Sequence, residues 1–177
     1  MTRQKMDRRS RRTRGALQSA FVELVMSRGY EAVNTGEICD RANVGRSTFY
    51  SHYRSKKALL EESLQHPCEG LAACLRPDAT SRDLLPLLAH FTEQRSLNRV
   101  FFEFPIRGVW VRTLARMIER RLPRSARPKL PAGLIALVVA ESQIALIAHW
   151  LTGKFSVQPD AVAAMLITNT RALLGNP

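Results

Sequence analysis

The spacing of apolar residues predicts helices along most of the chain. Between Ser10 and Arg28 the apolar side chains recur every three or four residues, which places them on one face of an α-helix. The alternation of apolar and polar residues that is typical of a β-strand does not occur. We therefore expect an all-α protein. The predicted helices are 10–28, 35–42, 46–52, 56–75, 83–95, 97–104, 109–122, 132–152 and 160–174.

Polar residues and glycines delimit the first three of these helices. Gly29 can end the first helix, because glycine tolerates the left-handed cap conformation. Asn34 followed three residues later by Glu37 is a capping-box pattern for the second. Asn43 can close that helix in the left-handed conformation, and Gly45 can cap the third. Two short helices joined by a tight turn predict a helix-turn-helix.

Positive charge is concentrated in the first third of the chain. The formal net charge is +12, and residues 1–14 hold seven basic residues against one acidic residue. Residues 1–57 hold 13 basic and 5 acidic residues, and residues 58–177 hold 14 and 10. Such a distribution favours a nucleic-acid partner for the N-terminal part.

Five motifs follow one another between residues 10 and 60. They are Arg28-Gly29-Tyr30, "NTGEICDRA", Ala42-Asn43-Val44-Gly45, Phe49-Tyr50-Ser51-His52-Tyr53 and Ser55-Lys56-Lys57-Ala58-Leu59-Leu60. With these motifs the segment resembles the TetR family of bacterial transcriptional regulators. The sequence departs from the usual family pattern at Asn43, where the family has glycine, and at Gly45, where it has serine. Both residues suit the backbone of a turn and a helix cap.

The expected organisation is a flexible basic arm at 1–9, a tri-helical helix-turn-helix DNA-binding domain at 10–55, and a helical effector-binding and dimerisation domain at 56–177. The C-terminal part resembles the family only in its number of helices and in its last apolar helix pair. An effector pocket between the middle helices is what the resemblance implies.

The third helix is predicted to read DNA. A recognition helix offers its first residues to base edges, so we expect Arg46, Ser47 and Thr48 to face the major groove. The resemblance implies phosphate or sugar contacts for Tyr50 and His52. Other phosphate candidates are Lys56 at the start of the fourth helix, then Thr35, Lys57, Arg11, Arg12 and Arg14. Phe49 and Tyr53 are expected in the core.

The remaining candidates lie in the C-terminal domain. The predicted pocket residues are Phe101, Phe104, Trp110, Met117 and Gln143, although apolar residues of this kind more often only form core. A basic segment from Arg112 to Lys129 could bind an anion or a partner, and a solvated face is the simpler interpretation.

The last two predicted helices are too apolar for the surface of a monomer. A two-fold four-helix interface is therefore expected, which predicts a homodimer and a palindromic operator. The proposed interface residues are Leu137, Glu141, Ile144, Trp150, Ala164 and Met165.

No arrangement typical of an enzyme or a metal site stands out. A catalytic triad, a phosphate loop and paired carboxylates are missing, and His66, Cys68, Cys74 and His90 fit no common zinc spacing. We expect no catalytic activity, no cofactor and no metal. Three cysteines cannot all pair within one chain, and the sequence shows no signal peptide. We therefore expect a cytoplasmic protein that does not associate with a membrane.

The sequence thus predicts a sequence-specific DNA-binding transcriptional regulator, a homodimeric repressor released by a small-molecule effector. Two alternatives stay open. One is a non-specific, nucleoid-type DNA-binding protein in which the basic arm dominates. The other is a small-molecule-binding protein with a vestigial DNA motif.

Overall fold

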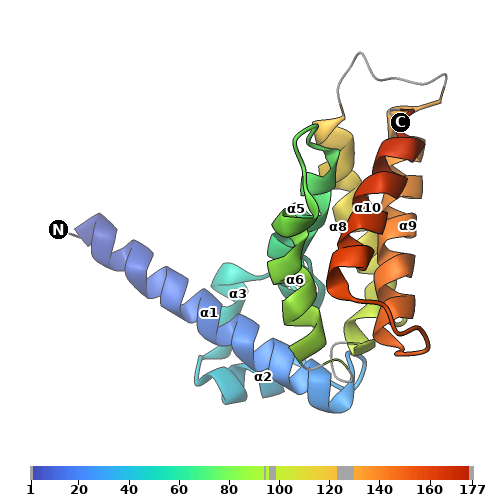
Figure 1. Ribbon diagram of the computed structural model, residues 1–177. Helices are drawn as coiled ribbons and strands as arrows, with labels where there is room; N and C mark the ends of the chain where they lie inside the picture. Colours follow the sequence, from blue (N-terminus) through green and yellow to red (C-terminus); the bar gives the residue numbers. More distant parts are fainter. Residues whose placement is uncertain (1, 94, 96–98, 123–129, 176–177) are drawn as a thin grey trace. The chain divides into compact units, whose positions relative to one another are not determined.

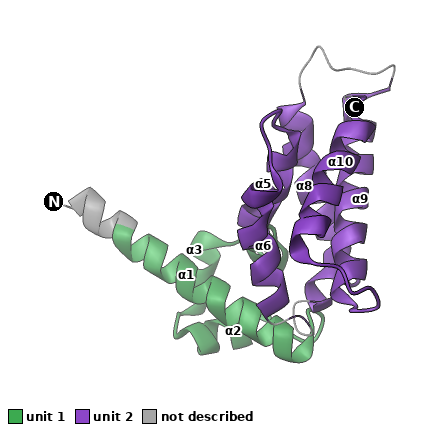
Figure 2. Cartoon of the chain, in the orientation of Figure 1, with its two compact units in different colours: residues 1–63 green, residues 64–177 purple. Residues whose placement is uncertain are grey.

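The computed structural model describes residues 2–93, 95, 99–122 and 130–175, and its regular elements within these ranges are all helices (Figure 1). The predicted all-α class is confirmed. The chain folds as two compact units, unit 1 with residues 1–63 and unit 2 with residues 64–177 (Figure 2).

Unit 1 is a small helical domain closed around aromatic and aliphatic side chains. The long α1 packs against α2 and α4, and α2 packs against α3. Phe21, Ile38 and Phe49 are fully buried where these helices meet. The helices of unit 1 are α1 (Thr2–Arg28), α2 (Thr35–Ala42), α3 (Arg46–His52) and α4 (Lys56–Ser63). The predicted bounds of α2 and α3 are confirmed.

The first nine residues differ from the expected flexible arm. The backbone of residues 2–9 forms the first turns of α1. The segment between Thr2 and Ser10 contains neither proline nor glycine, and its Arg, Lys, Gln and Met residues have high helix propensity. The helix therefore begins before Ser10, where the apolar stripe starts, because solvated helical turns need no apolar face.

The two compact units divide after Ser63, whereas the sequence placed the domain boundary after Ser55. The packing of α4 explains the difference, since α4 packs against α1 and its Leu59 and Leu60 are fully buried. The helix expected at 56–75, for which the sequence allowed an interruption at Pro67, is interrupted earlier, at Leu64, between α4 and α5 (Gln65–Ala72). Pro67 lies in the first turn of α5, where a missing N–H breaks no helical hydrogen bond.

Unit 2 is a bundle in which α8 packs against α9 and α5, and α10 packs against α6 and α9 (Figure 1). An aromatic cluster lies within it: Trp110 stacks on Phe102 with ring centroids 5.1 Å apart, and Phe91 meets both rings edge-on. The other elements of unit 2 are η1 (Ala73–Leu75), α6 (Ser81–Glu93), η2 (Arg99–Phe102), α8 (Ile106–Arg121), α9 (Ala132–Leu151) and α10 (Pro159–Leu173).

Within the described residues, α9 is one helix that is long and apolar enough to cross a membrane. Half of its most apolar stretch is buried inside the protein. Core helices commonly have this composition, because they are covered on more than one side. The packing of α9 against α8 and α10 accounts for its buried part.

Candidate nucleic-acid interface

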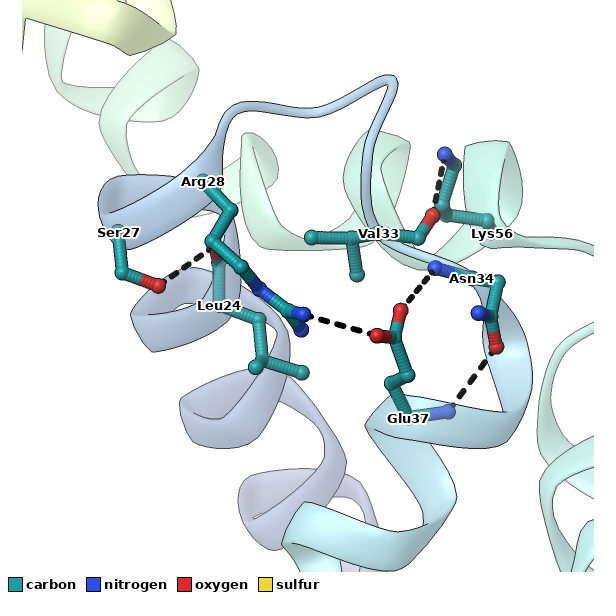
Figure 3. A network of polar contacts seen from close by, with 7 residues as sticks. All are labelled: Leu24, Ser27, Arg28, Val33, Asn34, Glu37 and Lys56. Atoms are coloured by element: carbon teal, nitrogen blue, oxygen red, sulfur yellow. Dashed lines mark hydrogen bonds and ion pairs between the residues drawn. The ribbon is translucent and has the colours of Figure 1, made fainter.

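The start of α2 is held by a network of polar contacts (Figure 3). The backbone N–H of Glu37 donates to the Asn34 side chain at 3.1 Å, and the Glu37 carboxylate accepts from the Asn34 N–H at 2.9 Å. Arg28 at the end of α1 donates to the same carboxylate at 2.9 Å. The Asn34 N–H and the Arg28 guanidinium together lower the pKa of Glu37. The predicted capping box is confirmed, and it ties α2 to α1.

The turn between α2 and α3 has the expected backbone. Asn43 lies in the left-handed region, with φ of 52°. Its N–H donates to the carbonyl of Asp40, and the Val44 N–H donates to the carbonyl of Cys39 at 2.9 Å. Gly45 then adopts an extended conformation as the N-cap of α3. The two helices therefore meet through a short, hydrogen-bonded turn.

The side chains of α3 separate into a buried and an exposed set. Phe49 is fully buried, and Tyr53, which follows the helix, is 3% exposed. The Tyr53 hydroxyl donates to Glu62 at 2.8 Å, and burial with this contact raises the tyrosine pKa. These two aromatic rings fix the helix on the core, as the sequence predicted.

The opposite face of α3 is open to a partner. The side chains of Arg46, Ser47 and Thr48 are exposed, and Tyr50 is 58% exposed. The Tyr50 and Phe49 rings meet edge-on with their centroids 5.4 Å apart, and the Phe49 ring is the one that packs in the core. His52 is half-buried beside Tyr53. Arg46, Ser47, Thr48 and Tyr50 are therefore exposed on a helix that Phe49 and Tyr53 hold on the core.

Arg46 is bent back onto α2, a feature that sequence reasoning missed. A methyl group placed on Gly36 would lie 2.8 Å from Nη2 of Arg46 and 3.5 Å from its Cζ. The guanidinium therefore lies across the first turn of α2. The signal in the sequence is the glycine itself, which is disfavoured inside a short, capped helix.

Lys56 occupies a different environment from the one expected. Its ammonium group donates to the backbone carbonyls of Tyr30 and Val33, both at 2.7 Å, and lies 4.0 Å from the centre of the Tyr30 ring. Burial lowers its pKa. The group links α4 to the loop before α2 (Figure 3), and these carbonyls take the donors that the sequence assigned to a phosphate. Lys57 beside it is exposed.

The remaining basic candidates of unit 1 lie on α1. Arg11, Arg12 and Arg14 are all exposed, and Arg14 lies 3.9 Å from the carboxylate of Glu62. Thr35 at the start of α2 is half-buried. These positions are compatible with phosphate contacts and add positive charge to unit 1.

The pocket residues predicted in unit 2 do not form one set. Trp110 and Gln143 are each 2% exposed and Phe101 is 9% exposed, whereas Phe104 is 93% exposed and cannot line a pocket in the core. The prediction for Phe104 is wrong, because η2 ends at Phe102 and the chain turns before α8 begins. Met117 is half-buried.

The predicted interface residues also divide. Leu137, Ala164 and Met165 are exposed, and Glu141 is half-exposed and paired with Arg107. Ile144 and Trp150 are wrong as surface residues, since both are buried within the protomer. Trp150 donates from its indole nitrogen to the carbonyl of Val157 at 2.9 Å. Because α9 is apolar on all sides, its sequence does not reveal which side covers its own core.

The basic segment continues along the outside of α8. Arg112, Arg116 and Arg120 are exposed, and Arg121 donates to the carbonyl of Glu69 at 3.4 Å. Arg124, Arg127 and Lys129 lie outside the described residues. Within the described ranges, the His, Cys, Asp and Glu side chains form no group that could hold a metal ion.

The helix-turn-helix has relatives of known family. Residues 19–63 match the model of the family described as bacterial regulatory proteins, tetR family. The chain is 39% identical over 64 residues to the uncharacterized HTH-type transcriptional regulator YxbF of Bacillus subtilis, covering 36% of this chain and 17% of that protein. It is 32% identical over 95 residues to the HTH-type transcriptional activator FasR of Mycolicibacterium smegmatis, covering 51% and 39%. The matched segments thus span less than half of these relatives.

Structural similarity extends over both units. A TetR transcriptional regulator from Streptococcus agalactiae superposes with a TM-score of 0.61 at 25% identity, covering 94% of this chain and 98% of that one. The N-terminal match, the helix-turn-helix geometry and the fold agree with one another. The chain is thus similar to the TetR family of bacterial transcriptional regulators in residues 19–63 and in its fold.

Proposed function

We propose that this protein binds a palindromic operator as a homodimer and represses transcription until a small-molecule effector releases it. The observation that carries the proposal is the exposed face of α3, where Arg46, Ser47, Thr48 and Tyr50 stand on a helix fixed by the buried Phe49 and Tyr53. Arg46 is the residue we assign to base recognition, since a guanidinium can donate two hydrogen bonds to guanine.

Positioning on the DNA backbone is assigned to the surrounding polar residues. Tyr50, His52, Thr35, Lys57 and the exposed arginines of α1 supply donors and charge for phosphates.

Dimerisation is supported by the apolar faces that α9 and α10 expose. Leu134, Leu137 and Val138 on α9 and Met165 on α10 are each more than 40% exposed. Leu137 and Val138 lie three and four residues after Leu134, so the three share one face of α9, and Met165 adds an exposed apolar position on α10. Pairing of two copies through both helices would bury these side chains and set two α3 helices on successive grooves.

An effector site is supported by polar atoms in the core of unit 2. Trp110 Nε1, Thr113 Oγ1 and Gln143 Oε1 are buried and make no hydrogen bond within the described part of the chain. Buried polar groups normally have partners. The buried polar side chains of the described part of unit 2 are uncharged: Thr113, Gln143 and Thr170. We therefore propose an uncharged effector that carries both hydrogen-bond donors and acceptors. Its binding would favour a dimer in which the two α3 helices no longer match the operator.

The decisive experiment is a binding titration on DNA from upstream of the gene and on random DNA of equal length, over a range of salt concentrations. Specific regulation predicts tighter binding to the upstream DNA at every salt concentration. Equal affinity for both, with the same steep salt dependence, would support the nucleoid-type alternative instead.

Two variants separate recognition from positioning. Arg46→Ala is expected to relax the sequence preference at one base pair of each half-site, and Lys57→Ala to weaken binding to all sequences alike.

Deleting the gene tests the sign of regulation. Loss of a repressor raises expression from the operator, and a fall in expression would identify an activator.

A further inference from the structure

The second residue of α2 is a buried glycine that lies directly beneath Arg46. A methyl group at Gly36 would meet Nη2 of Arg46 at 2.8 Å and Oδ1 of Asn34 at 3.1 Å. Glycine is, after proline, the residue least favoured inside a helix, and α2 has only eight residues. The position therefore has a low intrinsic helix preference that a larger residue would improve, and the space it leaves is taken by the arginine.

Arg46 is the first residue of α3, and its side chain crosses from α3 to the first turn of α2. A free arginine on a surface samples many rotamers, and fixing it on binding costs conformational entropy. A guanidinium that rests on a helix turn samples fewer rotamers before DNA binds, so binding costs less conformational entropy. That turn is itself fixed by the Asn34 and Glu37 cap and by Arg28 (Figure 3).

We infer that Gly36 is a positioning residue for Arg46: because it lacks a side chain, the guanidinium lies across the first turn of α2, and this placement decides which base pair Arg46 reads. Gly36 does not need to touch DNA for this role. The inference rests on the proposed function, in that Arg46 must contact a base.

A substitution at Gly36 displaces the arginine first. The atom that a methyl group would approach most closely is the far end of the flexible Arg46 side chain, which can shift, whereas Oδ1 of Asn34 at 3.1 Å, the acceptor of the cap, must give by a few tenths of an ångström. The helical backbone of Gly36 also accepts alanine, since its φ does not lie in the left-handed region. Gly36→Ala thus displaces the guanidinium while keeping its charge.

The test is a selection from random double-stranded oligonucleotides, followed by sequencing, with four proteins: the natural chain, Gly36→Ala, Arg46→Ala and the double variant. Gly36→Ala is expected to lower the preference at the base pair read by Arg46 on the order of tenfold, the scale of one bidentate contact. The double variant is expected to match Arg46→Ala. Because the charge is kept, the salt dependence of Gly36→Ala should equal that of the natural chain.

Gly15→Ala is the matched control. It also adds a methyl group to a helical glycine, but nothing lies within 4 Å of that site. Its sequence preference should equal that of the natural chain.

The outcomes separate the two proposals. If the natural chain shows no sequence preference, the proposed function fails. If it shows one that Arg46→Ala alters and Gly36→Ala leaves intact, only the role of Gly36 is overturned. A change of preference by Gly36→Ala that persists in the Arg46→Ala background overturns it as well.

Thermal melting covers the case in which Gly36→Ala folds poorly. If contact between the new methyl group and Arg46 causes the loss of stability, the double variant regains the melting temperature of Arg46→Ala. A double variant as unstable as Gly36→Ala alone would show that the arginine does not occupy this space.

Discussion

Lys56 shows how one side chain can connect a helix of unit 1 to a loop far from it in the sequence. Its ammonium group, at the start of α4, binds the carbonyls of Tyr30 and Val33 and lies over the Tyr30 ring. Val33 immediately precedes the cap of α2, so the lysine fixes the loop that leads into the helix-turn-helix. Its role in the free protein is therefore to hold the loop.

We expect Lys56→Met to lower the free energy of unfolding by about 1–2 kcal/mol, because two carbonyls in a half-buried site lose their donor. Lys57→Met is the matched control, since Lys57 is exposed, and should stay within about 0.5 kcal/mol of the natural chain. Urea unfolding followed by circular dichroism measures both. Equal values for the two variants would contradict the proposed holding role.

The three cysteines are expected to be unreactive in the folded protein. Cys39, Cys68 and Cys74 are each at most 2% exposed, and burial raises the pKa of Cys68 and of Cys74 to about 12. A thiol reagent at pH 8 should modify all three after unfolding and none rapidly before it. A fast-reacting thiol in the folded protein would show that one of these sites opens to solvent.

The same thiols make stability depend on alkaline pH. Thiols of the unfolded chain ionise near pH 9.0, whereas burial in the folded protein raises the pKa of Cys68 and of Cys74 to about 12. The folded state thus binds more protons across this window, and stability falls as the pH rises through it. Unfolding midpoints at increasing pH should show the fall, and Cys68→Ala should reduce its slope.

At the scale of elements, the turn between α2 and α3 is built around Asn43. Its φ of 52° is costly for most residues, by roughly 1–2 kcal/mol. Asn43→Ala should therefore destabilise the protein by about 1 kcal/mol, while Asn43→Gly should be close to neutral. Thermal melts of the two variants test this, and equal effects would mean that the left-handed conformation is not what Asn43 supplies.

Local signals explain why these elements could be predicted. The Asn34–Glu37 cap, the left-handed Asn43 and the extended Gly45 each act through neighbouring backbone, so residues close in sequence determined α2 and α3. The long α1 was only partly foreseen, because solvated arginines propagate a helix without an apolar stripe.

Contacts across the fold could not be predicted in this way. The donors of Lys56 reach carbonyls 23 and 26 residues earlier, and Gly36 meets an arginine on the next helix. Likewise the burial of Ile144 and Trp150 depends on which side of α9 faces α8 and α10. The composition of α9, apolar on every side, contains no such information.

At the scale of the whole molecule, the exposed apolar side chains of α9 and α10 should determine the oligomeric state. Leu137→Lys combined with Met165→Lys places two charges on the proposed interface, and we expect a monomer with weakened operator binding. Phe155→Lys is the control, since Phe155 is 59% exposed and lies on the loop between the two helices. Light scattering coupled to gel filtration gives the masses; a dimer unaffected by both substitutions would exclude this interface.

Glu141 affects which proteins could pair with this one through the proposed interface. It lies one turn from Leu137 and Val138 on α9, and Arg107 of the same chain neutralises it. A partner surface therefore needs no opposing charge at this point, so charge alone does not distinguish a second copy from a related protein with a similar apolar face. At this position of the proposed interface, the shape of the packed helices is then what could tell one partner from another. Two such regulators made in one cell would otherwise form hybrids, each carrying two different recognition helices and binding operators with unlike halves.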